Sequence, residues 1–299
     1  MIVDMHRHMW SVFERYPNAS HRFTRRFGPP PPPKSALDGN ERTADILAEM
    51  EEARIARSVI VVADFALRLG EGLLAIEEEN RLVADLARSH PGRLIPFLGV
   101  DPRRPGALDL FRTGLDDWSV AGLKLHPATG FFPYDPVCFP LFDLAGQRGV
   151  PVLVHTGPMV PPLYSRMGQP VHLDDVAADF PRTTIIMAHV GLCWWEEALE
   201  IAWHKPNIIL ELSTWQWTFL REPREFVRAV ATMKDSIGAD RIVFGSDFPA
   251  LRAAMSLRSW VEVFQGLPDL ARDHGFRISE ADAQAILGGN AKRLLRLGD

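Results

Sequence analysis

Residues 184–189 read Thr-Ile-Ile-Met-Ala-His, a short apolar run that ends on a polar residue. Short apolar runs occur eight times along the chain. Ile2–Val3 opens the first, and the others are Ser58–Ala63, Leu94–Val100, Ala121–Leu125, Val152–Val154, Thr184–Ala188, Asn207–Leu212 and Arg241–Gly245. Near-continuous apolar runs, in contrast to alternating ones, are typical of strands that are buried on both faces of a parallel sheet. The sequence therefore predicts eight parallel strands.

Helical patterns fill the segments between these runs: Thr43–Arg54, Ala75–His90, Gly106–Asp116, Cys138–Arg148, Leu173–Asp179, Trp194–His204 and Glu222–Ser236. The tail predicts further helix over Ala253–Phe264 and Ser279–Leu297, with Ser279 as the N-cap and Asp282 three residues later. Strand–helix alternation repeated eight times favours an α/β fold of the (β/α)₈ TIM-barrel type over an open sheet.

The chain has 299 residues, whereas a TIM barrel typically needs about 250. We expect one domain, residues 1–299, in which the surplus forms two loops on the rim of the barrel. Met9–Arg42, a Pro-rich insertion that contains Pro29–Pro33, follows the first strand, and Thr156–Val171 follows the fifth. Both follow the C-terminal ends of strands, where barrel active sites are built. We therefore expect both segments to cover a site and to govern its substrate.

Composition narrows the classes of partner. The 33 Lys and Arg residues against 38 Asp and Glu residues give a net charge of −5, so no basic field is available to hold a nucleic acid. The two cysteines suit a reducing compartment. The sequence has no apolar run of about 18 residues, so it predicts no membrane span. We expect a cytoplasmic protein without a membrane partner.

Six polar side chains lie at the C-terminal ends of predicted strands: His6, His8, Lys124, His155, His189 and Asp247. His6 and His8 are one strand period apart, so both should point into the barrel. Imidazoles with one carboxylate are suitable ligands for Zn²⁺, Mn²⁺ or Fe²⁺. A single histidine at a strand end is more often a packed residue, but six such groups on one rim predict a metal site.

The neighbours of these residues are predicted to have structural roles. Asp4 should lie one layer deeper, in a barrel-core hydrogen bond, and Arg7 should point to the helix layer. His126 shares the inward direction of Lys124, and binding substrate and a structural role are equally favoured for it.

The sequence resembles the amidohydrolase superfamily, and within it amidohydrolase family 2, over nearly the whole chain. The resemblance rests on Asp4-Met5-His6-Arg7-His8, on His155, His189 and Asp247 in order, on Asp240–Pro249 (DRIVFGSDFP) and on Ile286–Ala291 (ILGGNA). Gly122–Pro127 (GLKLHP) is similar to the motif of binuclear relatives whose lysine is carboxylated.

The resemblance implies that His6, His8 and Asp247 hold a first divalent metal (zinc, iron or manganese). It implies that His155 is either a further ligand of this metal or a ligand of a second one. It implies that His189 ligates a second metal in a binuclear centre, or acts as an acid or base on substrate in a mononuclear one. Lys124, carboxylated, would bridge two metals, and two per chain are favoured. The alternative is that Lys124 stays an amine paired with Asp247 or with a substrate carboxylate. Relatives are often dimers, which leaves a homodimer open.

These features together favour a metal-dependent hydrolase that cleaves an ester, thioester, lactone or amide by metal-activated hydroxide, with Asp247 and His189 as catalytic residues. The alternative is a mononuclear metal-dependent non-oxidative decarboxylase of an aromatic or muconate-type acid, with His189 as a source of the proton. A Gly-x-Ser-x-Gly elbow, which would indicate a serine nucleophile, does not occur.

Aromatic residues after strand ends indicate a small, partly apolar substrate. Candidate substrate-binding residues are His126, Trp10, Trp215 and Trp217. At least one of Trp194 and Trp195 should instead start a helix and pack inward. Arg25, Arg26, Arg166 and Arg252 are candidate clamps for a substrate carboxylate or phosphate.

Overall fold

The computed structural model describes residues 1–22 and 37–298. Eight parallel strands pair in sequence order: β1 (Val3–Arg7), β2 (Arg57–Val61), β3 (Leu94–Gly99), β4 (Gly122–Leu125), β5 (Val152–His155), β6 (Ile185–Ala188), β7 (Ile208–Glu211) and β8 (Ile242–Val243). The last strand returns to the first, because Met5 N donates to Phe244 O at 3.0 Å and Arg7 forms a parallel bridge with Phe248. The predicted eight-stranded (β/α)₈ TIM barrel is confirmed.

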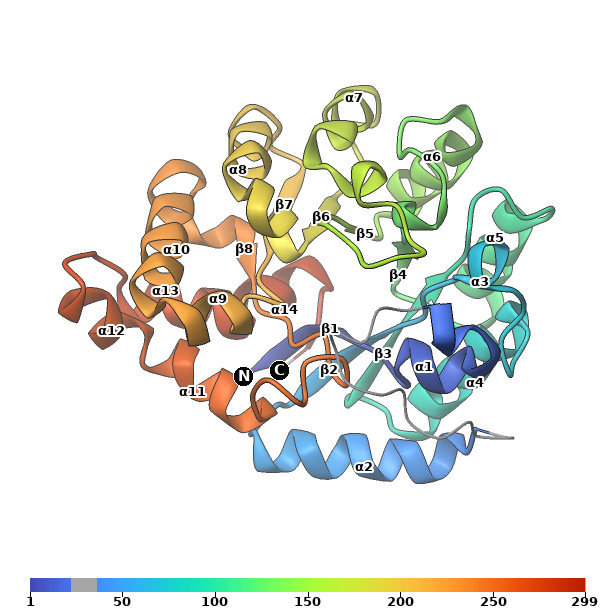
Figure 1. Cartoon of the computed structure of the whole chain (residues 1–299), viewed down its shortest axis with the longest axis horizontal. Helices are drawn as coiled ribbons and strands as arrows, with labels where there is room; N and C mark the ends of the chain where they lie inside the picture. Colours follow the sequence, from blue (N-terminus) through green and yellow to red (C-terminus); the bar gives the residue numbers. More distant parts are fainter. Residues whose placement is uncertain (23–36, 299) are drawn as a thin grey trace.

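Helices lie around these strands in chain order (Figure 1). They are α1 (Val12–Arg15), α2 (Gly39–Glu52), α3 (Ala66–Leu69), α4 (Ile76–Ser89), α5 (Ala107–Asp117), α6 (Phe139–Arg148), α7 (Asp174–Asp179), α8 (Trp195–His204), α9 (Gln216–Arg221), α10 (Pro223–Ile237), α11 (Leu257–Gln265), α12 (Leu267–Asp273), α13 (Glu280–Gln284) and α14 (Asn290–Leu294). In the described part of the chain, none of these helices has the length and apolar character needed to cross a membrane.

Ile2–Val3 open a predicted strand that carries His6 at its C-terminal end, and β1 accordingly runs from Val3 to Arg7. Its polar residues find buried partners. Asp4 accepts hydrogen bonds from Ser246 N at 2.9 Å and Ser246 Oγ at 2.6 Å, and Arg7 pairs with Glu49 of α2. These contacts confirm the core role of Asp4 and the outward direction of Arg7.

The C-terminal helices differ from the predicted ones in their bounds. α11 begins at Leu257, after Ser256 caps it by accepting from Ser259 N. The expected helix over Ser279–Leu297 is interrupted by one turn of π-helix at Ala285–Gly289, although Ser279 and Asp282 form the predicted capping box. Trp195 begins α8 and packs in the core, as predicted for at least one of the two tryptophans.

A small apolar cluster, separate from the main core, lies among the loops that follow β1, β2, β4 and β5. Its buried members are Tyr16, Ala19, Ala63, Phe65, Ala66, Leu69, Ala128 and Leu163. Loop residues from both predicted rim segments therefore pack against each other through apolar side chains. The run Pro29–Pro33 lies outside the described residues.

Candidate metal centre

Three of the predicted ligands converge at the junction of β1 and β8. Nε2 of His8 lies 3.3 Å from Oδ1 of Asp247, and Nε2 of His6 lies 3.8 Å from the same oxygen. His6 lies within β1 and is buried. His8 and Asp247 follow β1 and β8, and their side chains are 18% and 15% exposed. The group can therefore be reached from the rim.

The other nitrogen of each ring is already occupied. His8 Nδ1 lies 3.1 Å from the carbonyl oxygen of Val61, and His6 Nδ1 lies 3.1 Å from Oε2 of Glu211. Because a carbonyl and a carboxylate only accept hydrogen bonds, each Nδ1 carries the proton in the neutral ring and each Nε2 presents a lone pair. Two lone pairs and a carboxylate oxygen then face one another, and this set of acceptors fits a divalent cation.

Lys124, at the centre of β4, joins this group from the opposite side. Its Nζ lies 3.3 Å from Nε2 of His6, and the side chain is buried. Burial lowers the pKa of Lys124 to about 8, although the negative charges of Asp247 and Glu211 oppose the change. About a tenth of this amine is therefore neutral at pH 7.

His155, at the end of β5, stacks on His126, with ring centroids 4.2 Å apart and an angle of 11° between the planes. Nε2 of His155 and Nδ1 of His126 are buried and have no hydrogen-bond partner among the described residues. Burial, with the charges of neighbouring histidines and Lys124, lowers the pKa of both rings well below the usual value. Two neutral imidazoles with unpartnered nitrogens fit ligation of a metal or contact with a substrate.

His189 follows β6 and stacks on His6 at a centroid distance of 5.0 Å. Its Nδ1 lies 2.8 Å from both Ser213 Oγ and Thr214 Oγ1. Burial lowers the pKa of His189 to about 4, against the attraction of Asp247. His189, Thr214 and Asp247 all have positive φ angles, of 65°, 71° and 55°. Such backbone strain is often found at functional sites.

Asp247 is held as a carboxylate. Burial would raise its pKa, but electrostatic attraction to the adjoining rings of His8, His6 and His189 holds the pKa well below its usual range. The second oxygen, Oδ2, accepts from Thr214 Oγ1 at 3.2 Å.

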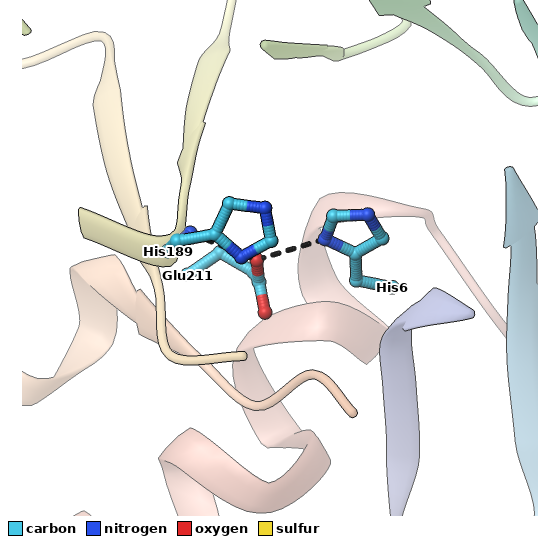
Figure 2. Close-up of side chains that lie close together, drawn as sticks. All are labelled: His6, His189 and Glu211. Atoms are coloured by element: carbon cyan, nitrogen blue, oxygen red, sulfur yellow. Dashed lines mark hydrogen bonds and ion pairs between the residues drawn. The ribbon is translucent and has the colours of Figure 1, made fainter. Parts of the chain in front are cut away.

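Glu211, the last residue of β7, was not predicted as a site residue, yet it is fully buried between His6 and His189 (Figure 2). Burial raises the pKa of Glu211, while the charge of His189 and hydrogen bonds from Ser213 oppose the change. The sequence does contain one indication, because a lone carboxylate inside a strand buried on both faces must have polar partners.

The predicted substrate residues are dispersed. Trp10 and Trp215 are buried at 3% and 2% exposure, and Trp217 is half exposed. The indole of Trp215 donates to the carbonyl of His189 at 2.9 Å, so this tryptophan supports the loop that carries the histidine. Binding of substrate by these residues and by His126 stays a prediction.

Two of the four candidate arginine clamps lie within the described residues. Arg252 pairs with Glu49, and Arg166 is exposed on the fifth loop. Arg25 and Arg26 lie outside the described residues.

Comparison with known proteins places this geometry in a family. The amidohydrolase family model matches residues 3–297, and no curated protein matches the chain. An uncharacterised TIM-barrel protein from Bordetella bronchiseptica is 26% identical, with a TM-score of 0.71 over 99% of this chain and 98% of that one.

Two more distant structures share the fold. An amidohydrolase from Burkholderia multivorans with bound zinc is 18% identical, with a TM-score of 0.71 over the whole of both chains. The 5-carboxyvanillate decarboxylase from Sphingomonas paucimobilis is 15% identical, with a TM-score of 0.67 over 99% of each chain. Since the family model covers nearly the whole chain, the protein belongs to the amidohydrolase family of metal-dependent enzymes, which includes both hydrolases and decarboxylases.

Proposed function

We propose that this protein is a metal-dependent hydrolase that cleaves an ester, thioester, lactone or amide bond of a small, partly apolar organic substrate. The observation that carries the proposal is the set of acceptor atoms at the β1–β8 junction, His6 Nε2, His8 Nε2 and Asp247 Oδ1, with Lys124 Nζ beside it.

His6, His8 and Asp247 would hold one divalent metal. A second would be held by Lys124 as a carbamate, with His155 and His189. When bound, such a metal lowers the pKa of a coordinated water toward neutrality and polarises a carbonyl group.

The protein's own groups favour removal of protons over their delivery. Asp247 is ionised, because its pKa is held low, and can accept a proton from water. His189, with a pKa of about 4, is neutral at pH 7 and is therefore not an acid that delivers a proton. Hydrolysis needs a base to activate water, whereas decarboxylation needs an acid that protonates carbon, so Asp247 and His189 fit hydrolysis when Lys124, whose pKa is about 8, is carboxylated and no longer a proton donor.

Lys124 supports a binuclear centre. As an ammonium group it could ligate no metal, but its lowered pKa makes the neutral amine accessible. The amine nitrogen can attack the carbon of CO₂ and lose a proton, which leaves a carbamate with two anionic oxygens. Those oxygens would lie close to His6.

The apolar side of the substrate would lie against the cluster of rim loops. Phe65 belongs to that cluster, and its ring centroid is 4.6 Å from that of His126. Because His126 in turn stacks on His155, a continuous aromatic surface connects the cluster to the ligands.

Metal analysis tests the number of metals. Protein purified without chelator should contain about two metal ions per chain, and Lys124→Ala should lose one. The control is Lys205→Ala, since Lys205 pairs with Asp174 away from the centre. One metal per chain, unaffected by Lys124→Ala, would contradict the binuclear centre.

Product analysis tests the reaction. Incubation with a panel of lactones, esters, thioesters and amides, and separately with aromatic carboxylic acids, distinguishes hydrolysis from release of CO₂. Turnover only of the carboxylic acids, with CO₂ as product, would assign the decarboxylase instead.

A further inference from the structure

The hydroxyl group of Ser213, just beyond the end of β7, lies within hydrogen-bond distance of three buried side chains. Its Oγ is 2.8 Å from Glu211 Oε2, 2.8 Å from His189 Nδ1 and 3.2 Å from His6 Nδ1. Glu211 Oε2 also lies 3.1 Å from His6 Nδ1 and accepts from the backbone N–H of His189 at 3.2 Å. We call these four residues, His6, His189, Glu211 and Ser213, the β7 hub.

The direction of each hydrogen bond follows from the carboxylates of Glu211 and Asp247, which only accept. Ser213 has one hydroxyl hydrogen, which it gives to Glu211, and it then accepts from Nδ1–H of His189. His6 likewise donates from Nδ1 to Glu211. Thr214 Oγ1 gives its hydrogen to Asp247 Oδ2 and is therefore an acceptor toward His189.

All donors in this arrangement have an acceptor, and both imidazoles carry their proton on Nδ1. The opposite tautomer of His189 would require Ser213 or Thr214 to donate to the ring. One carboxylate oxygen would then face a hydroxyl oxygen with no hydrogen between them, which is unfavourable for buried groups.

We propose that Glu211, together with Ser213, is a positioning residue that fixes His6 and His189 in the tautomer with an unprotonated Nε2. The inference deepens the proposed function, on which its metal-binding readout rests. A carboxylate behind a ligating histidine orients the ring and raises the basicity of its other nitrogen. Here one carboxylate serves two histidines, directly for His6 and through Ser213 for His189.

The fold confines Glu211 to this place. Its other oxygen, Oε1, accepts from Ser213 N at 2.6 Å. On the other side lies Gly245, where an added Cβ would be only 2.8 Å from Glu211 Cδ and 3.0 Å from His6 Cβ. The position after β8 therefore accommodates Glu211 only because it is a glycine.

Direct ligation of a metal by Glu211 is the competing interpretation. Single atoms of His6, His189 and Glu211 do lie within 4.8 Å of one another. However, Glu211 already accepts from His6 Nδ1 and from Ser213 Oγ, and Ser213 Oγ accepts from His189 Nδ1. The hub is therefore already satisfied by hydrogen bonds, and we assign it to orientation of the ligands.

Glu211→Gln tests the assignment with almost no change of shape. The carboxylate accepts at both oxygens, so the amide NH₂ must face a donor in either rotamer. Zinc affinity, measured by competition with a chromophoric chelator, should fall about 10- to 100-fold. The matched control is Glu79→Gln, which changes another buried glutamate that pairs with Arg15.

A zinc affinity of Glu211→Gln within fivefold of wild type would overturn the inference, and so would an equal loss in Glu79→Gln. Loss of one zinc ion per chain at saturating zinc would also overturn it, in favour of direct ligation. If Glu211→Gln does not fold, Ser213→Ala carries the same measurements, because it removes the shared hydroxyl group.

Nitrogen-15 NMR of the metal-free protein supplies a readout that does not depend on the proposed function. His6 and His189, assigned through His6→Asn and His189→Asn, should show protonated Nδ1 and unprotonated Nε2. Glu211→Gln should change the tautomer of His6. Protonated Nε2 in the wild type would overturn the inference, whereas a wild type that binds no zinc would overturn the proposed function alone.

Discussion

Gly245→Ala should displace Glu211 without any change in the chemistry of the carboxylate. Ordinary van der Waals contacts of a Cβ begin at 3.4 Å, and the added Cβ would lie 2.8 Å from Glu211 Cδ. The side chain must therefore move by at least the difference of 0.6 Å, and Oε1, which is closer to the added atom, must move further. The backbone of Gly245 itself is not in the left-handed region, so the strain comes from this contact.

The displacement carries two energetic costs. Overpacking a core position costs about 1–3 kcal/mol. The Oε1 contact with Ser213 N, now 2.6 Å, would lengthen beyond hydrogen-bond range, and loss of a hydrogen bond to a charged group costs about 1.5–3 kcal/mol. The free energy of unfolding should therefore fall by about 2.5–6 kcal/mol, and zinc affinity should fall about 10- to 100-fold.

Urea unfolding of the metal-free protein measures the first quantity, and chelator competition measures the second. Gly289→Ala is the matched control, because its added Cβ would meet only Gln284 O at 3.6 Å in a helical backbone. The control should retain wild-type stability or gain a little. If Gly245→Ala unfolds within about 0.5 kcal/mol of wild type and binds zinc equally well, Glu211 is not confined as argued.

Two further variants test the surroundings of the centre. His189 has a pKa of about 4 in the folded protein and 6.5 in the unfolded chain. Between these pH values the unfolded chain binds one more proton than the folded protein. The free energy of unfolding of the metal-free protein should therefore fall by about 3 kcal/mol as the pH drops from 6.5 to 4. Urea unfolding over this pH range should show a smaller loss for His189→Gln. Glu49→Gln removes the salt-bridge partner of the buried Arg7 guanidinium and should cost about 3–5 kcal/mol in the same assay, with the metal content unchanged.

The sequence predicted the barrel and the convergence of the candidate ligands because both are repeated features. Each strand is a short buried apolar run, and the histidines and Asp247 come directly at or after the end of such a run. In a parallel barrel all those ends lie on one rim, so chain order alone brings them together.

The role of Glu211 could not be predicted in that way, because β7 ends on this carboxylate and no histidine directly follows it. Its role depends on distances to His6 and Ser213 across the sheet, which follow from strand register. The Trp10 and Trp215 predictions relied on position after a strand end, but that position does not determine exposure. Both indoles pack inward, since core volume and a partner for Trp215 Nε1 outweigh access to solvent.

The hydrogen bonds of the β7 hub also bear on which reaction this member of the family carries out. Nδ1–H of His6 and of His189 both point away from the centre, toward Glu211 and Ser213, and Thr214 gives its hydrogen to Asp247. The centre is thus lined by lone pairs, and Lys124 is the donor that faces His6. Carboxylation would convert that donor into two acceptor oxygens. A site built from acceptors would hold cations and remove protons from water, as the proposed hydrolysis requires, whereas an uncarboxylated Lys124 would leave a proton donor in the centre, as the alternative decarboxylation requires.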